Sequence, residues 1–289
     1  MFDKYIINEL NYYYKTIDNS KLREIIKYSL EDGKCIRGFI VKHIIETLTG
    51  ECNYWQPIVS IELIHGISLI LDDLPCMDND LMRRNKPSTF AKYGERQAIL
   101  VSMYGISEAF KLLFNGIKNI KELFTEDKLY IQTLENLVSD WHELIGKNLI
   151  VGQMMDFKDN ISELLNLDIP NNNHSINLIY YKTSSLFIFA FVLGAIFSYN
   201  TNKNINIEDF KQMGQYFGLM YQIMDDSNDM ETDDIHKNIF LTMGYDNSIK
   251  LYKDAEEKLV ELLIKNSLLT SDFENLIYKL NKKLVKKST

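Results

Sequence analysis

Three long segments that are apolar on nearly every helical face constrain the fold more than any other feature of the chain. Apolar residues recur at helical spacing, with few polar positions, in Ile58–Leu71, Ala98–Phe114 and Lys182–Phe197. A helix that is apolar all round is stable only when other elements cover it on every side. These segments therefore predict a helical bundle in which several central helices are surrounded by others.

The supply of turn-forming residues points the same way. The 289 residues include 13 Gly and 4 Pro, which is about half the usual share. Alternating strand-like segments are not evident, and no internal repeat of fixed period is present. The sequence therefore predicts a single all-α domain over residues 1–289, built from roughly ten to twelve helices.

Charge and cysteine content exclude several classes of protein. Lys and Arg number 32 against 40 Asp and Glu, so the net charge is −8, which argues against a nucleic-acid partner. Cys35, Cys52 and Cys76 lack CxxC spacing, which excludes a disulfide framework and a cysteine zinc site. The first residues resemble no signal or transit peptide, and the apolar run Leu186–Phe197 is too short for a transmembrane segment. We therefore expect a cytoplasmic protein.

Two clusters of aspartates each follow an apolar helical segment. The first, DDLPCMDND, contains Asp72, Asp73, Asp78 and Asp80, and the second, DDSND, contains Asp225, Asp226 and Asp229. Asp225 and Asp229 are one helical turn apart and share a face. In the first cluster, Pro75 is expected to loosen the helix so that Asp78 turns back toward Asp72.

Closely spaced carboxylates repel each other unless a cation lies between them. Oxygen ligands without His or Cys favour Mg²⁺, which binds a few carboxylates together with substrate phosphates. The alternative interpretation is that both clusters are solvated loops at helix ends. The recurrence of the same arrangement after two apolar helices favours the metal site.

Basic residues accompany both clusters. Lys34 and Arg37 are three residues apart in DGKCIRG, Arg83 and Arg84 follow the first cluster, and Lys182 and Thr183 begin an apolar helix. Paired arginines beside carboxylates suit diphosphate recognition, in which guanidinium groups and a bridging metal share the negative charge. His65 precedes Asp72 by two helical turns and is a candidate contact in this setting.

These motifs, in this order, resemble those of the trans-isoprenyl diphosphate synthases. DDLPCMDNDLMRRNKPS is similar to the first aspartate-rich motif of that family in its long form, and YQIMDDSND to the second. GKCIR, ELIHGISLILDD, GQMMD and KTSSL extend the likeness over nearly the whole chain. The resemblance implies an isoprenoid-synthase helical bundle around a central cavity, usually assembled as a homodimer.

The resemblance also implies a role for each matching residue. Asp72, Asp78, Asp225 and Asp229 would bind Mg²⁺, about three ions per active site, with Asp73 and Asp226 in support. The allylic diphosphate would be bound by Arg83, Lys182, Thr183, Gln222 and Lys237. Isopentenyl diphosphate would be bound by Lys34, Arg37, His65 and Arg84. Gln153 and Asp156 match positions near the metal and its waters.

The implied reaction is the head-to-tail condensation of isopentenyl diphosphate with dimethylallyl, geranyl or farnesyl diphosphate. Ile67 and Ser68 occupy the positions where an aromatic residue would stop the product at fifteen carbons. Neither is aromatic, so geranylgeranyl diphosphate (C20) is the expected product, with farnesyl diphosphate (C15) as the alternative. Ile67→Phe is expected to shorten the product, unless Ile64 or Met103 sets the floor of the pocket.

Some segments depart from the family pattern. GKCIRG replaces GKRxRP, so Cys35 and Gly38 stand where Arg and Pro are usual, and SMYG at Ser102–Gly105 replaces a GDAL-type segment. A non-catalytic partner subunit of a prenyl synthase is therefore an alternative, although such subunits usually lose an aspartate motif. A terpene cyclase would not need basic residues for a second diphosphate. A di-metal carboxylate bundle needs a second Glu-x-x-His besides Glu62–His65, and the sequence has none.

Overall fold

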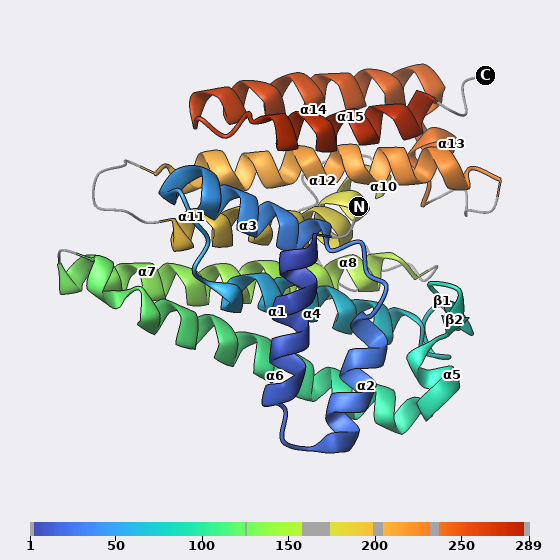
Figure 1. Cartoon of the computed structure of the whole chain (residues 1–289). Helices are drawn as coiled ribbons and strands as arrows, with labels where there is room; N and C mark the ends of the chain where they lie inside the picture. The colour runs from blue at the N-terminus through green and yellow to red at the C-terminus, as the bar shows by residue number, and fades with distance from the viewer. Residues whose placement is uncertain (1–2, 125, 158–173, 199–204, 232–236, 286–289) are drawn as a thin grey trace. The chain divides into compact units, whose positions relative to one another are not determined.

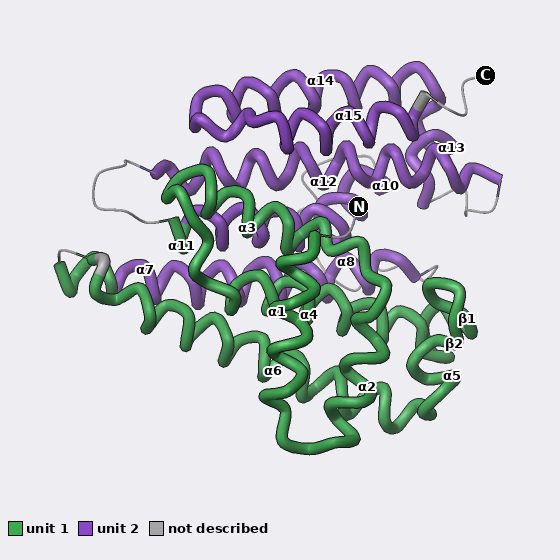
Figure 2. Tube along the Cα trace, viewed as in Figure 1, with its two compact units in different colours: residues 1–130, 196–202 green, residues 131–195, 203–289 purple. Residues whose placement is uncertain are grey.

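A computed structural model of the chain describes residues 3–124, 126–157, 174–198, 205–231 and 237–285. The chain divides into two compact units, coloured separately in Figure 2. Unit 1 comprises Met1–Tyr130 and Ile196–Asn202, and unit 2 comprises Ile131–Ala195 and Lys203–Thr289. The first aspartate cluster lies in unit 1 and the second in unit 2.

Unit 1 consists of helices and one short hairpin, shown in blue to green in Figure 1. Its elements are α1 (Lys4–Thr16), α2 (Ser20–Leu30), α3 (Ile36–Thr49), α4 (Trp55–Asp72), β1 (Met82–Arg83), β2 (Lys86–Pro87), α5 (Thr89–Tyr93), α6 (Glu95–Asn119) and a 3₁₀ turn at Lys121–Leu123. Asp3 and Asn19 cap α1 and α2 by accepting hydrogen bonds from backbone N–H groups of the first turn.

All regular secondary structure among the described residues of unit 2 is helical. Helix α7 (Asp127–Asp140) leads into it from unit 1 and continues through a π-helical segment (Trp141–Asn148) into α8 (Leu149–Met155). The next continuous helical stretch is α10 (His174–Leu178), a π-helical segment (Ile179–Ser184) and α11 (Ser185–Phe197). The remaining helices are α12 (Ile207–Asp229), α13 (Ile239–Met243), α14 (Tyr245–Lys265) and α15 (Ser271–Val285).

The core of unit 1 forms where α4 packs along α6, with α1, α2 and α3 against its other sides. Ser60 in α4 donates a hydrogen bond to the Ala109 carbonyl of α6 (2.9 Å), so even a polar position of α4 is paired inside the core. The prediction that helices surround Ile58–Leu71 is confirmed, since the apolar side chains at its centre are buried.

Helix α6 is not surrounded in the same way. One face of Ala98–Phe114 is buried, but Ile99, Leu100, Met103, Ile106 and Phe114 are all at least 40 % exposed. The prediction that this segment is covered on every side is therefore wrong for the single chain, because only one side of α6 contacts α4 and its neighbours.

The core of unit 2 is built on α12, which packs against α14, α15 and the π-helical segment Ile179–Ser184. A Cβ atom at Gly214 of α12 would lie only 2.3 Å from the Ile188 Cα atom, so glycine is what permits this approach. The stretch His174–Phe197 is long and apolar enough to cross a bilayer, but 83 % of its most apolar window is buried inside the protein. It is therefore a core helix, as predicted.

The hairpin after the first aspartate cluster is the feature that sequence patterning did not predict. Met82 pairs with Pro87 and Arg83 with Lys86 in an antiparallel register. Arg84 and Asn85 form the connecting turn with φ of 54° and 61°, as a tight two-residue hairpin requires. Each strand has only two residues. The prediction of an all-α fold is therefore confirmed despite the hairpin.

Candidate active site

The first aspartate cluster begins at the last residue of α4. The helix ends at Asp72, Pro75 follows, and the chain turns back so that the Asp78 N–H donates to the Asp72 carbonyl (2.9 Å). Likewise, the Asp80 N–H donates to the Asp73 carbonyl (3.1 Å). The predicted return of Asp78 to Asp72 is therefore present in the backbone, and it follows from the end of the helix just before Pro75.

The carboxylates of this cluster have different environments. Asp73 is 1 % exposed and accepts two hydrogen bonds from Arg83, one of them from Nε at 2.8 Å. Burial raises the pKa of Asp73, although Arg83 opposes this shift. Asp72 is half-buried and Asp78 is exposed. Asp73 thus orients Arg83, whereas Asp72 and Asp78 face solvent where a ligand can reach them.

The second aspartate cluster repeats this division in unit 2. Asp226 is buried and accepts hydrogen bonds from the Ile239 N–H (2.9 Å) and from Gln222 Nε2 (2.7 Å), so it joins the end of α12 to the start of α13. Asp225 is half-buried and Asp229 is exposed. Asp226 therefore stabilises the fold, whereas Asp225 and Asp229, which share a helical face, are at least partly exposed to solvent.

A second acidic centre in unit 2 pairs two lysines. Asp156, at the end of α8, lies 2.6 Å from Lys182 Nζ and 2.9 Å from Lys237 Nζ. Burial alone would raise the pKa of Asp156, but the two ammonium groups outweigh it and hold the pKa below its usual value. The carboxylate therefore stays ionised and keeps both lysines together.

Thr183 and Gln222 connect this lysine pair to the second aspartate cluster. The Thr183 hydroxyl donates to Gln222 Oε1 (2.6 Å), and Gln222 in turn donates to Asp226. The residues predicted from the family to bind the allylic diphosphate in unit 2, namely Lys182, Thr183, Gln222 and Lys237, are thus linked through Asp156 and Asp226. Residues 232–236, which connect Asp229 to Lys237, lie outside the described part of the chain.

In unit 1, the predicted isopentenyl diphosphate residues surround the α2–α3 connection. Lys34 is exposed and Arg37 is 8 % exposed. Arg84 donates to the carbonyl oxygens of Leu30 (3.1 Å) and Glu31 (2.9 Å) at the end of α2. Arg84 therefore caps a helix, which is a structural role that the sequence did not reveal.

His65 lies close to the same positive charges. Burial lowers its pKa well below the usual value, and the charges of Arg37 and Arg84 lower it further. Its Nδ1 atom is buried and has no hydrogen-bond partner in the described structure. His65 is therefore a buried neutral imidazole with one ring nitrogen that has no hydrogen-bond partner among the described residues.

The predicted chain-length residues lie on α4 one turn before the aspartates. Ile67 is 2 % exposed, and its Cδ1 atom lies 2.3 Å from where a Cβ atom at Gly105 would be. Ser68 donates a hydrogen bond to the His65 carbonyl (2.9 Å). Met103, the other candidate for the pocket floor, is 66 % exposed on α6. Gly105, in the altered SMYG segment, instead makes room for Ile67.

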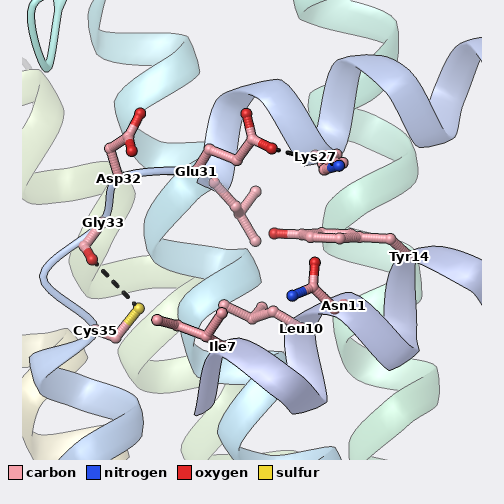
Figure 3. A pocket seen from close by; sticks show the side chains of 10 residues that line it. Ile7, Leu10, Asn11, Tyr14, Lys27, Glu31, Asp32, Gly33 and Cys35 are labelled. Carbon is pink, nitrogen blue, oxygen red and sulfur yellow. Dashed lines mark hydrogen bonds and ion pairs between the residues drawn. The ribbon is translucent and has the colours of Figure 1, made fainter. Parts of the chain in front are cut away.

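A pocket of about 300 Å³ lies beside this region of unit 1, between α1, α2 and the α2–α3 connection (Figure 3). Its walls include Leu10, Tyr14 and Glu31, with Cys35 at one edge. Burial raises the pKa of the Cys35 thiol to about 12, and the charge of Glu62 adds to this shift. Cys35 is therefore a protonated wall residue and not a nucleophile.

The donor set fits Mg²⁺. No group of three or more His, Cys, Asp or Glu side chains forms a metal site by itself within the described ranges. Mg²⁺ commonly binds to one or two carboxylates and completes its coordination with water and substrate phosphates. The half-buried or exposed pairs Asp72 with Asp78 and Asp225 with Asp229 suit this mode, whereas Asp73 and Asp226 are buried and hydrogen-bonded within the fold.

Comparison with solved structures shows the fold class. The geranyltranstransferase of Thermotoga maritima aligns with a TM-score of 0.76 at 23 % identity, over 96 % of this chain and 97 % of that one. An isoprenoid synthase family member from Thermotoga neapolitana aligns with a TM-score of 0.73 at 26 % identity, over 95 % and 97 %. The chain therefore has the all-helical isoprenoid synthase fold.

Sequence comparison shows the family. The polyprenyl synthetase family model matches residues 19–241. The farnesyl diphosphate synthase of Micrococcus luteus is 34 % identical, over 83 % of this chain and 77 % of that protein. A large subunit of the heterodimeric geranylgeranyl pyrophosphate synthase of Arabidopsis thaliana is 32 % identical over 78 % of this chain. The matched region spans 58 % of that subunit's length. The chain belongs to the polyprenyl synthetase family.

Proposed function

We propose that the protein is a Mg²⁺-dependent prenyltransferase that condenses isopentenyl diphosphate with allylic diphosphates head to tail. The observation that carries this proposal is the shared design of the two aspartate clusters. In each, a buried aspartate is engaged in internal hydrogen bonds, and two further aspartates are half-buried or exposed, so that solvent reaches them. Basic residues beside each cluster suit a diphosphate.

Asp72, Asp78, Asp225 and Asp229 would hold Mg²⁺, which would supply positive charge to balance that of the diphosphate. Lys182 and Lys237, kept together by Asp156, bind the allylic diphosphate, with Arg83, Thr183 and Gln222 as further contacts. Because Asp156 already orients the two lysines, their ammonium groups can stabilise the negative charge that develops as the allylic C–O bond breaks.

The diphosphate leaves with the bonding electron pair, and an allylic carbocation remains. Lys34, Arg37, Arg84 and neutral His65 place isopentenyl diphosphate so that its double bond attacks this carbocation. The new C–C bond forms, and a proton passes to the released diphosphate. The chain needs no nucleophile of its own, and its apolar walls protect the carbocation from water.

We propose a C20 product, with a C15 product as the alternative. Neither Ile67 nor Ser68 is aromatic, and the Gly105 position accommodates the Ile67 side chain against α6. We also propose that the protein is a homodimer. The exposed apolar face of α6 supports this assembly, and light scattering would measure its molar mass.

The test is an assay of purified protein with Mg²⁺, isopentenyl diphosphate and each of the C5, C10 and C15 allylic primers, with mass spectrometry of the products. We expect a C20 product that is lost on chelation and in Asp72→Ala, and that shortens in Ile67→Phe. Asp254→Ala, a change at an exposed position of α14, should behave as wild type. A C15 product from wild type would retain the enzyme and refute the C20 assignment. Absence of product with every primer would refute the proposal and favour a non-catalytic partner subunit.

A further inference from the structure

Glu62 is a buried carboxylate whose role the motifs do not explain. It lies in the middle of α4 and is 5 % exposed. Its Oε1 atom accepts a hydrogen bond of 2.6 Å from the backbone N–H of Gly38, in the first turn of α3. A buried carboxylate without partners is strongly destabilising, so this contact makes Glu62 part of the α3 terminus.

Glu62 supplies what the local sequence of α3 lacks. The first N–H groups of a helix need acceptors, which a side chain at the N-cap position usually provides. Here the N-cap is Cys35, whose side chain makes no capping hydrogen bond to α3 and whose φ is 51°. A carboxylate from α4 therefore takes the place of the cap, and its charge also suits the positive end of the helix dipole.

Gly38 makes this arrangement possible. A Cβ atom at this position would lie 3.0 Å from Glu62 Cγ and 3.2 Å from its Oε1 atom. The resembling family segment has proline here, and proline has no N–H to donate. The exchange of proline for glycine thus gives Glu62 both the donor and the space that it uses.

Arg37, which directly precedes Gly38, is the residue of this turn that the family resemblance assigns to isopentenyl diphosphate. Arg37 is buried in the same turn of α3. The N–H of Gly38 donates to Glu62, and the charge of Arg37 acts to lower the pKa of Glu62 against the effect of burial. A buried guanidinium is costly without such a counter-charge.

We propose that Glu62 is a positioning residue for isopentenyl diphosphate. By holding the first turn of α3, it fixes Arg37 and the preceding Lys34 in the orientation that binds the diphosphate. This inference rests on the proposed function. If Glu62 has this role, the GKCIRG segment can still bind isopentenyl diphosphate, because α4 supplies the cap that the first turn of α3 lacks.

Glu62→Gln tests the inference, because the amide keeps a hydrogen-bond acceptor and loses the charge. The matched control is Glu108→Gln, which removes a buried carboxylate from α6 that pairs with Lys111 at the surface. We expect Glu62→Gln to raise the KM for isopentenyl diphosphate about tenfold. The KM of Glu62→Gln for the allylic primer should stay within about twofold of wild type, and so should the KM values of Glu108→Gln for both substrates.

Gly38→Ala provides a second variant that keeps the charge and the N–H. It displaces Glu62 by a few tenths of an ångström, so a smaller but equally selective rise in the isopentenyl diphosphate KM is expected, even if Glu62→Gln fails to fold. The inference would be overturned if the KM values for isopentenyl diphosphate and for the allylic primer changed equally, or if neither variant changed either value. Product formation by the wild-type protein would still support the proposed function in that case. A wild-type chain that binds no isopentenyl diphosphate by calorimetry would overturn both.

Discussion

The contact between Gly152 and Lys182 provides the sharpest test of how unit 2 is packed. Helix α8 and the π-helical segment Ile179–Ser184 approach so closely at Gly152 that an added Cβ atom would lie 2.4 Å from the Lys182 backbone nitrogen. Ordinary van der Waals contact begins at 3.4 Å. The difference, 3.4 − 2.4 = 1.0 Å, is the displacement that Gly152→Ala imposes on the backbone that carries Lys182.

This displacement should affect both stability and activity. Overpacking a close helix contact costs about 1–3 kcal/mol of unfolding free energy, because the atom that must move belongs to the backbone. A shift of about 1 Å in a group that binds the reacting part of a substrate costs about a hundredfold in rate. We therefore expect Gly152→Ala to lose about 1–3 kcal/mol of stability and about a hundredfold in kcat/KM for the allylic primer.

Gly146→Ala is the matched control, since it is the same substitution in the preceding helical segment. A Cβ atom there would meet nothing closer than 3.6 Å, and alanine favours the helix by about 0.5–1 kcal/mol. Denaturant unfolding and steady-state kinetics of the two variants would be compared with wild type. If Gly152→Ala were as stable and active as Gly146→Ala, the inferred contact between α8 and the Lys182 backbone would be refuted.

Two further predictions concern charged groups. Asp156→Asn should cost about 1–3 kcal/mol at neutral pH. The folded pKa of Asp156 lies below its unfolded value, so this deficit should shrink as the pH falls below about 4 and disappear below the folded pKa. Denaturant unfolding at several pH values would measure it. A deficit that does not change with pH would contradict the ion pairs of Asp156 with Lys182 and Lys237. Arg84→Ala should lose about 1–2 kcal/mol of unfolding free energy, because the carbonyl groups at the end of α2 lose their donor. The control Arg96→Ala, at an exposed position of α6, should not lose stability. Equal stability of the two variants would refute the capping role of Arg84.

The sequence by itself determined the helical class and the positions of the candidate site. Apolar periodicity in Ile58–Leu71 and Lys182–Phe197 predicted buried helices, because a helix without a polar face has to be covered. The spacing of the aspartates predicted which carboxylates share a face, since this depends only on the helical repeat. Pro75 predicted that the chain turns Asp78 back toward Asp72, because proline interrupts a helix.

Only the tertiary structure decided how chemically identical side chains divide their roles. Asp73 and Asp226 are buried and hydrogen-bonded within the fold, whereas Asp72 and Asp225 reach solvent. Each buried aspartate is adjacent to its accessible neighbour in the sequence, so composition and spacing cannot separate them. What separates them is the surface that packs against the helix end, and segments distant along the chain supply part of it.

The same reason applies to Glu62 and α6. The hydrogen bond from Gly38 to Glu62 joins residues 24 positions apart, and the local sequence of α3 gives no sign that its cap comes from α4. The exposed face of α6 carries large apolar residues such as Leu100 and Met103, so periodicity in Ala98–Phe114 predicted a surrounded helix. Burial and long-range hydrogen bonds depend on which elements contact each other in the folded chain. A local sequence pattern shows only where the apolar and polar residues of one element lie.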